Sequence, residues 1–206
     1  MDYLITPYQN AFIQGKNISD NILIAHEILD IHRRKKGREN NFGVLKIDIS
    51  KAYDRVDWNF LRAILITKNF DSKWIMECVT YVNYTLLVNG NLTRSFKPSK
   101  GLRQGDPLSL YLFLLCANIL SIALMQAKNS NKIKGIKVGR SAHSFTHLLF
   151  ANDSLLFFRK DNQSPTNIQK VLEWYCALSG QKLNLSKSDL LTWPKRTKKT
   201  LLDPYR

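Results

Sequence analysis

The pattern of apolar and polar positions near residue 150 predicts a β-hairpin. Residues 147–149 and 154–158 are mostly apolar β-formers, and a short polar pair, Asn152 and Asp153, separates them. Asn and Asp accept the backbone geometry that a tight turn requires. We therefore expect the turn to present an acidic side chain at one fixed point of a sheet.

A second apolar stretch, residues 43–49, predicts a strand that carries one carboxylate, Asp48. An Asp is disfavoured in such a strand and is costly to bury without a partner. An ion pair with Lys46 or Lys51 would satisfy it, and so would a bound cation. Two acidic points on separate strands of one sheet are what two-metal phosphoryl transfer requires.

Helical spacing of apolar residues predicts helices over about 19–36, 57–68, 71–82, 107–125 and 165–178. Ser19 and Asp57 are suitable N-caps for the first two. The sequence Asn89-Gly90-Asn91 lies between two further apolar runs and predicts another hairpin. Because helices and hairpins mix without regular strand–helix alternation, the expected fold class is α+β, with an antiparallel sheet backed by helices.

The balance of charge points to a polyanionic partner. The chain has 206 residues, enough for one domain or two closely packed subdomains, and 31 Lys and Arg against 16 Asp and Glu give a net charge of +15. Nucleic acid is the first candidate for such a chain. A generally basic surface without a dedicated ligand is the alternative.

Other features argue against several classes of protein. The three cysteines lie far apart and form no CxxC pair, so neither a zinc site nor a disulfide framework is indicated. The longest apolar stretch, residues 108–125, is interrupted by Ser109, Asn118 and Ser121, which favours a core helix over a membrane span. No secretory signal is evident, so we expect an intracellular protein of the nucleus or cytoplasm, with no membrane partner.

The loop at residues 101–108 leads into the long predicted helix. Its glycines and the helix N-terminus could present backbone N–H groups to an anion, and Arg103 adds positive charge. A simple capped turn is the alternative, with Asp106 as the cap and Pro107 at the first helical position. That alternative leaves Gln104 unexplained.

Four segments in order resemble successive motifs of a reverse transcriptase: residues 46–56, 101–109, 150–153 and 179–188. The likeness is greatest to LINE-type (non-LTR) retrotransposons, particularly plant copies. Residues 9–16 and 19–21 also resemble the segment before the fingers helix. The resemblance implies a polymerase right hand, with residues 1–42 as a fingers-like part and 43–206 as mostly palm, with some fingers contribution. We expect the thumb to be absent.

The resemblance also implies a reaction and its partners. In this family a primer 3′-hydroxyl attacks the α-phosphorus of a dNTP on an RNA template, and two Mg²⁺ ions stabilise the attacking and leaving oxygens. Mg²⁺ prefers carboxylates, phosphate oxygens and water, which explains the use of Asp. Asp48 and Asp153 would be the metal ligands, with Asn152 beside them.

Further roles follow only from the resemblance. Lys187 would act as a general acid toward pyrophosphate. Substrate-binding roles fall on Ile49 through its backbone, Tyr53 beneath the sugar, Gln104 and Gly105 in the nucleotide pocket, and the basic residues Arg103 and Lys16. For Tyr53, an aromatic ring packed in the core is the alternative interpretation.

Three positions depart from the family: Asn152 in the turn, Leu110 where Pro is usual, and Asn118 where an acidic residue is usual. The family has two adjacent Asp residues in the turn, whereas this chain has Asn152 followed by Asp153. An amide oxygen can contact Mg²⁺ but supplies no negative charge, so we expect little or no polymerase activity. The alternatives are a nucleic-acid-binding module without catalysis, a relic open reading frame, and an intron maturase-like RNA binder.

Overall fold

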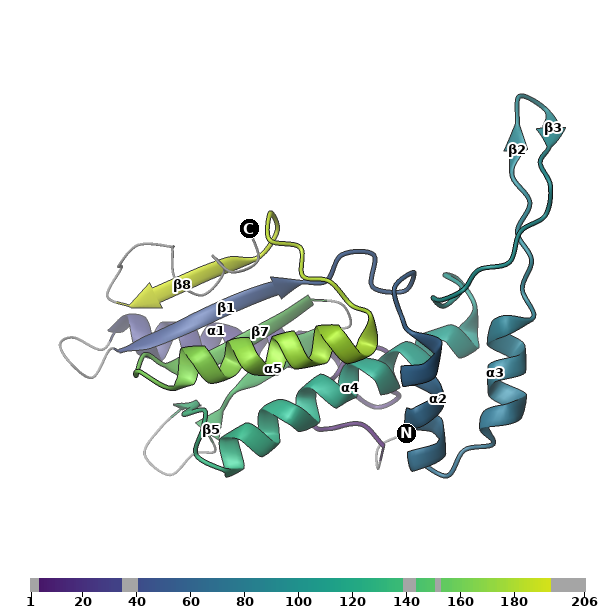
Figure 1. Ribbon diagram of the computed structural model, residues 1–206. Helices are drawn as coiled ribbons and strands as arrows, with labels where there is room; N and C mark the ends of the chain where they lie inside the picture. Colours follow the sequence, from purple (N-terminus) through teal and green to yellow (C-terminus); the bar gives the residue numbers. More distant parts are fainter. Residues whose placement is uncertain (1–3, 35–40, 139–143, 151–152, 194–206) are drawn as a thin grey trace.

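The computed structural model describes residues 4–34, 41–138, 144–150 and 153–193. Its elements, shown in Figure 1, are α1 (Ile18–Arg34), β1 (Phe42–Asp48), α2 (Trp58–Thr67), α3 (Ser72–Thr80), β2 (Leu87–Val88), β3 (Asn91–Leu92), α4 (Pro107–Asn129), β4 (Ile136–Lys137), β5 (Ser144–Phe145), β6 (His147–Phe150), β7 (Asp153–Arg159), α5 (Ser164–Ser179) and β8 (Asp189–Trp193). The expected α+β class is confirmed.

The main sheet has four antiparallel strands in the order β6-β7-β1-β8. Side chains alternate between its two faces. On one face, Leu45 and Ile47 of β1 join the larger core beneath α2, α4 and α5. On the other face, Phe42 and Val44 join a smaller core beneath α1. Figure 1 shows α4 and α5 on one side of the sheet and α1 on the other.

The face beneath α1 is covered along only part of its length. At the Phe42 end of β1 the side chains are buried, whereas Lys46 is exposed and Asp48 is half-buried. The small core therefore ends before the end of the strand. This leaves the Asp48 end of the sheet accessible.

The helix α4 is the central helix of the larger core. Asp106 caps it, because its Oδ2 accepts hydrogen bonds from Ser109 N at 3.0 Å and Ser109 Oγ at 2.7 Å, and Pro107 occupies the first helical position. The helix is long and apolar enough to cross a membrane by length and composition, but 61% of its most apolar window is buried in the fold. It packs against α2, α5 and β6.

The helix caps follow the sequence with one exception. Asp57 caps α2 and Asp71 caps α3, each accepting two backbone hydrogen bonds. The expectation that Ser19 caps the first helix is wrong, because α1 begins at Ile18. Asn17 holds that position, and its Oδ1 accepts the Ser19 N–H at 3.0 Å.

The β2–β3 hairpin projects away from the body of the molecule (Figure 1). Its turn is Asn89-Gly90, with φ of 49° and 80°, which matches a two-residue type I′ turn. Asn91 is already in β3, so the turn is one residue shorter than the sequence suggested. The strands have two residues each, since no layer packs against them and Leu87 and Leu92 are exposed.

A buried histidine makes the stability of this fold dependent on pH. His147 on β6 is hydrogen-bonded to Ser121 Oγ at 2.6 Å and Thr146 Oγ1 at 3.0 Å, and its ring centroid lies 4.5 Å from that of Tyr8. Burial, with a smaller effect from the charge of Lys128, lowers the pKa of His147 from 6.5 to about 3. The folded state therefore holds this imidazole neutral.

We predict that acid destabilises the protein through His147. The unfolded state takes up a proton below pH 6.5 and the folded state does not, so the stabilisation is complete above pH 6.5 and falls as the pH drops toward 3. Between pH 7.5 and 5.0 this amounts to about 2 kcal/mol of unfolding free energy. Urea unfolding at both pH values measures it. A His147→Gln variant should lose less stability over this interval, and an equal loss would contradict the assignment.

Candidate active site

The two predicted carboxylates lie opposite each other in the sheet. Asp48 ends β1, Asp153 begins β7, and the antiparallel register pairs them directly. Directly opposed residues have Cβ atoms about 4.5–5.5 Å apart, with side chains on the same face. This is the accessible face that also carries Lys46. Asn152 lies outside the described residues.

The segment 182–188 is fixed to the end of β1 by backbone hydrogen bonds. Ser50 N donates to Lys182 O at 2.8 Å, and Asn184 N donates to Asp48 O at 2.9 Å. Asp48 N donates to Ser188 Oγ at 3.2 Å. Both backbone groups of Asp48 are thus bonded within the protein, and its side chain faces the accessible side.

The turn that follows β1 is held from two directions. Leu102 N donates to Tyr53 O at 2.9 Å, and Gly101 N donates to Val56 O at 2.8 Å. From the other side, Gln181 Nε2 donates to Ala52 O at 2.8 Å. These contacts bring the loop before α4 and the loop after α5 to the same place. Segments that are about 130 residues apart in sequence therefore meet around the end of β1.

The loops enclose a cavity of about 570 Å³, a size typical of small-ligand sites. Six residues singled out from the sequence line it: Asp48, Ile49, Tyr53, Gln104, Gly105 and Lys187. The acidic residue Asp48 and the basic residues Lys51 and Lys187 are thus all part of the lining. Such a lining suits a ligand that carries both anionic groups and a bound cation.

Tyr53 has a packing role as well as a place in the cavity. Its ring stacks on Phe113 of α4, with centroids 4.6 Å apart and planes at 17°. Burial raises the pKa of Tyr53, so its hydroxyl stays neutral. The stacking fixes the ring at the cavity wall. The two interpretations of this residue, core packing and substrate contact, are therefore compatible in one position.

The polar residues of the loop before α4 divide into two groups. Gln104 lines the cavity, and its Nε2 donates to Asp54 Oδ1 at 3.4 Å. Arg103 is exposed and does not line the cavity. Lys16 is also outside the lining, and its Nζ donates to Gln9 O at 3.3 Å. The structure thus brings Gln104 to the site but not Arg103 or Lys16.

Sequence reasoning placed Asn184 and Ser188 within a family motif but assigned them no role in this site. Asn184 lines the cavity and its backbone binds Asp48, while Ser188 accepts the Asp48 N–H and donates to Asn184 O at 2.8 Å. Both fall in a segment without apolar periodicity. A run of Asn and Ser residues such as Asn184, Ser186 and Ser188 is typical of a turn in which side chains hydrogen-bond to the nearby backbone. That pattern could have indicated their role.

The site offers two carboxylates as possible metal ligands. Among the described residues no group of three or more His, Cys, Asp or Glu side chains could hold a metal ion. Asp48 and Asp153 alone fit a hard cation that completes its coordination with phosphate oxygens and water. They do not fit a structural metal site that is closed by protein ligands.

Comparison with known sequences gives one family and several relatives. The profile of the family described as Reverse transcriptase (RNA-dependent DNA polymerase) matches residues 2–200. The chain is 29% identical over 190 residues to the Transposon TX1 uncharacterized 149 kDa protein of Xenopus laevis, covering 90% of this chain and 14% of that protein. It is 29% identical over 185 residues to the Retrovirus-related Pol polyprotein from type-2 retrotransposable element R2DM of Drosophila melanogaster, covering 88% and 16%.

A shorter match is to an uncharacterized mitochondrial protein of Arabidopsis thaliana, with 44% identity over 68 residues, 33% of this chain and 56% of that protein. The chain thus spans less than two thirds of the length of each of these relatives.

Two solved structures share the fold. One is apo telomerase from Candida tropicalis, truncated from its C-terminal domain, with a TM-score of 0.61 and 13% identity, covering 93% of this chain and 37% of that chain. The other is telomerase from Candida albicans in complex with a fragment of telomeric RNA, with a TM-score of 0.61 and 16% identity, covering 88% and 31%. At these identities the likeness concerns the fold alone.

We predict that Gly101→Ala destabilises the protein and distorts the site. Gly101 has φ of +91°, and an added Cβ would lie 2.8 Å from Asp54 O. Left-handed strain and overpacking together should cost about 2–4 kcal/mol in urea unfolding. Gly15→Ala is the matched control, because Gly15 has φ of +78° with open space around it. Equal losses in the two variants would argue against the close contact.

Proposed function

The chain belongs to the reverse transcriptase (RNA-dependent DNA polymerase) family, and we propose that it is the fingers-and-palm part of a polymerase that copies RNA into DNA. The expected likeness to non-LTR retrotransposons is confirmed by its similarity to the retrotransposable element R2DM and to transposon TX1, and the plant likeness agrees with the Arabidopsis match. The pairing of Asp48 with Asp153 in the sheet is the observation that carries the proposal.

Asp48 and Asp153 would hold two divalent cations, with Mg²⁺ as the preferred ion. When bound, such ions stabilise charge on the attacking and leaving oxygens of an in-line phosphoryl transfer. The protein's part is to fix the two carboxylates. The β1–β7 ladder sets the two residues opposite each other, and on the other side of β1 Asp48 is held because Asn184 N donates to Asp48 O and Asp48 N donates to Ser188 Oγ. The Ile49 carbonyl follows directly along the chain.

The cavity would receive the incoming dNTP. The 3′-hydroxyl of the primer would lose its proton to solvent and attack the α-phosphorus of the dNTP, and the bond from that phosphorus to the bridging oxygen of pyrophosphate would break. Lys187 Nζ would donate a proton to the departing pyrophosphate, and Gln104 and Gly105 would contact the nucleotide. The Tyr53 ring, fixed by stacking on Phe113, would lie under the sugar and obstruct a ribose 2′-hydroxyl.

We further propose that catalysis is impaired by Asn152. The two cations would face two carboxylates rather than three, which weakens metal binding at contact distance. Each 1.4 kcal/mol or so of lost transition-state stabilisation lowers the rate about tenfold. A nucleic-acid-binding module without catalysis is therefore the second candidate function, favoured by the net charge of +15 together with Asn152.

We predict that Asn152→Asp raises the rate of primer extension on an RNA template at least tenfold, because it restores one negative charge beside the metal ligands. Adding Asp48→Asn to that variant should abolish the gain. Asp189→Asn is the matched control, since Asp189 lies in the same sheet at the register of Lys46 and outside the cavity.

Two outcomes would count against these proposals. Extension by the unaltered chain as fast as by Asn152→Asp would contradict the impairment. If primer–template binds but neither protein extends the primer, the binding module becomes the better account.

A further inference from the structure

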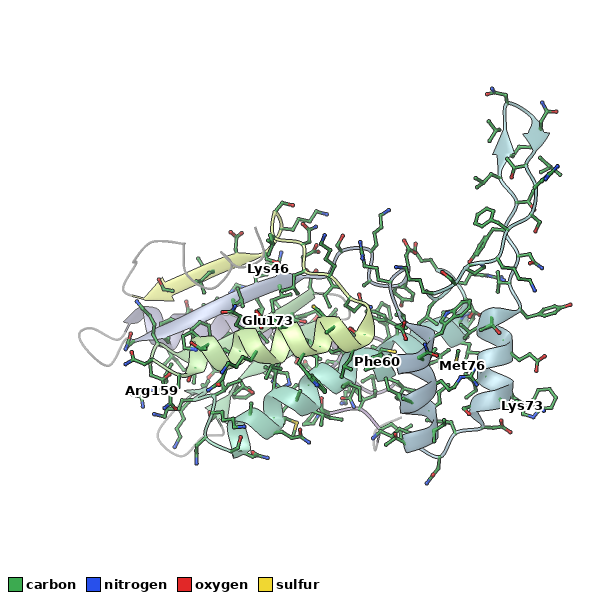
Figure 2. The ribbon with its side chains drawn as sticks, in the orientation of Figure 1. Lys46, Phe60, Lys73, Met76, Arg159 and Glu173 are labelled. Carbon is green, nitrogen blue, oxygen red and sulfur yellow. The ribbon has the colours of Figure 1, made fainter. Side chains whose placement is uncertain are left out.

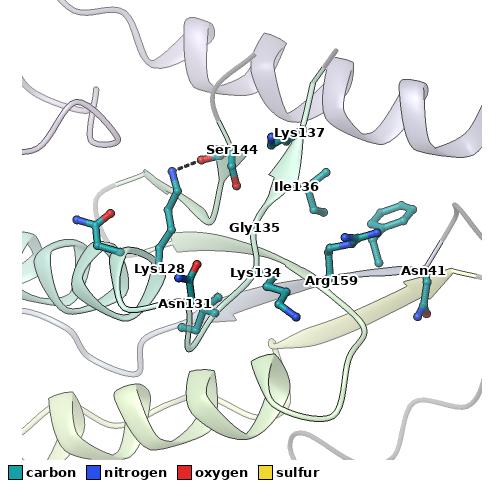
Figure 3. A pocket seen from close by; sticks show the side chains of 12 residues that line it. Asn41, Lys128, Asn131, Lys134, Gly135, Ile136, Lys137, Ser144 and Arg159 are labelled. Atoms are coloured by element: carbon teal, nitrogen blue, oxygen red, sulfur yellow. Dashed lines mark hydrogen bonds between the residues drawn. The ribbon is translucent and has the colours of Figure 1, made fainter. Parts of the chain in front are cut away.

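A second cavity of about 570 Å³ lies at the other end of the two central strands (Figure 3). Phe42 and Arg159, which face each other in the register of β1 and β7, both line it. The carboxylates Asp48 and Asp153 are six residues along the same strands. At about 3.3 Å per residue, the two ends are roughly 20 Å apart. The second cavity is therefore separate from the candidate active site.

Within the described ranges, four cationic side chains line this cavity: Lys128, Lys134, Lys137 and Arg159. They come from the end of α4, the following loop, β4 and the end of β7 (Figure 3). In the described part of the chain, the ion pair at this site is between Lys134 and Asp161, at 3.5 Å. Asp161 therefore offsets one of the four positive charges. Among the residues that the structure describes, no carboxylate lines the cavity.

One of these positive charges, that of Lys128, belongs to a half-buried side chain. Lys128 Nζ donates to the backbone carbonyl of Ser144, and desolvation lowers the pKa of Lys128. The charge of Lys128 also contributes to the low pKa of buried His147. A concave site with walls of low dielectric focuses the field of such charges toward its opening. An anion in the cavity would relieve their mutual repulsion.

The wall of the cavity is fixed by backbone contacts. Gly135 lies so close to β5 that an added Cβ would be 2.4 Å from Phe145 O. Arg159 N donates to Lys134 O at 2.7 Å, which ties the end of β7 to the loop before β4. Asn41 and Asn131 add amide groups to the lining. The backbone that carries the basic side chains is thus held in place by hydrogen bonds and close packing.

We propose that this cavity, called here the basic cavity, binds the phosphodiester backbone of a nucleic acid at a contact separate from the active site. The choice of nucleic acid rests on the proposed function, whereas the choice of a phosphate-bearing ligand rests on the lining. Lysine, arginine and amide donors are the groups that contact phosphate oxygens. A strand stacked as in a duplex rises about 3.4 Å per nucleotide, so about six nucleotides would span the distance from Asp48 to this cavity.

The test compares two triple variants in binding a labelled 12-nucleotide single-stranded RNA. Lys134→Gln, Lys137→Gln and Arg159→Gln together remove three of the four positive charges of the basic cavity and leave Lys128 in place. Arg62→Gln, Lys73→Gln and Lys170→Gln together remove the same charges from exposed helix positions outside it. Figure 2 places Lys73 on α3, at the opposite end of the molecule from Arg159.

We expect the basic-cavity variant to bind at least tenfold more weakly than the control variant at 0.1 M salt, by fluorescence anisotropy. The slope of log K against log salt should also be shallower by about two. Each phosphate contact on a single strand contributes about 0.7 to this slope, and the variant loses three cationic side chains. Equal affinities and equal slopes would overturn the proposal. Circular dichroism of all three proteins checks that the fold is kept.

A second readout gives the location directly. RNA that carries 4-thiouridine should cross-link to peptides from residues 128–137 and 159 in the unaltered chain. Cross-links confined to residues 48–53 and 184–187 would overturn the proposal. Primer extension is measured separately with Asn152→Asp, so cross-linking at the basic cavity without extension by that variant would remove the proposed polymerase function and leave this binding site.

Discussion

The register of the β1–β7 ladder is the constraint on which the rest of this structure depends. It pairs Asp48 with Asp153 at one end and Phe42 with Arg159 at the other. Because side chains alternate along a strand, a slip of one residue would turn Asp48 into the apolar core and expose Ile47 in its place. The burial of Leu45, Ile47 and Phe158 beneath the helices opposes such a slip. The packing of the core therefore fixes the position of the carboxylates.

The two central strands, β1 and β7, carry carboxylates at one end and adjoin basic side chains at the other. The carboxylates lie where the layer formed by α1 ends, and the basic cavity lies where the strands meet the end of α4. Loops from distant parts of the chain brace both ends, through Leu102 and Gln181 near the active site and through Lys134 near the basic cavity. A basic chain with a net charge of +15 thus presents two of its 16 acidic side chains, Asp48 and Asp153, side by side at one accessible point.

The sequence predicted the features that depend on local pattern. Strand β1, the caps Asp57 and Asp106 and the class of the fold follow from periodicity and short-range hydrogen bonds. The gathering of Gln104 and Lys187 in one cavity was expected only from the family resemblance, because loops 80 residues apart meet through tertiary contacts. The same limit explains why the positions of Arg103 and Lys16 could not be foreseen. The role of Asn184 was missed because its contribution is a backbone hydrogen bond to Asp48.

The most direct measurement of the central claim is Mn²⁺ binding followed by electron paramagnetic resonance, with Mn²⁺ standing in for Mg²⁺. If the paired carboxylates form a divalent-cation site, the unaltered chain binds Mn²⁺ and either Asp48→Asn or Asp153→Asn weakens the binding strongly. Asp189→Asn, in the same sheet, leaves it unchanged. Binding that is equal in all four proteins would contradict the account.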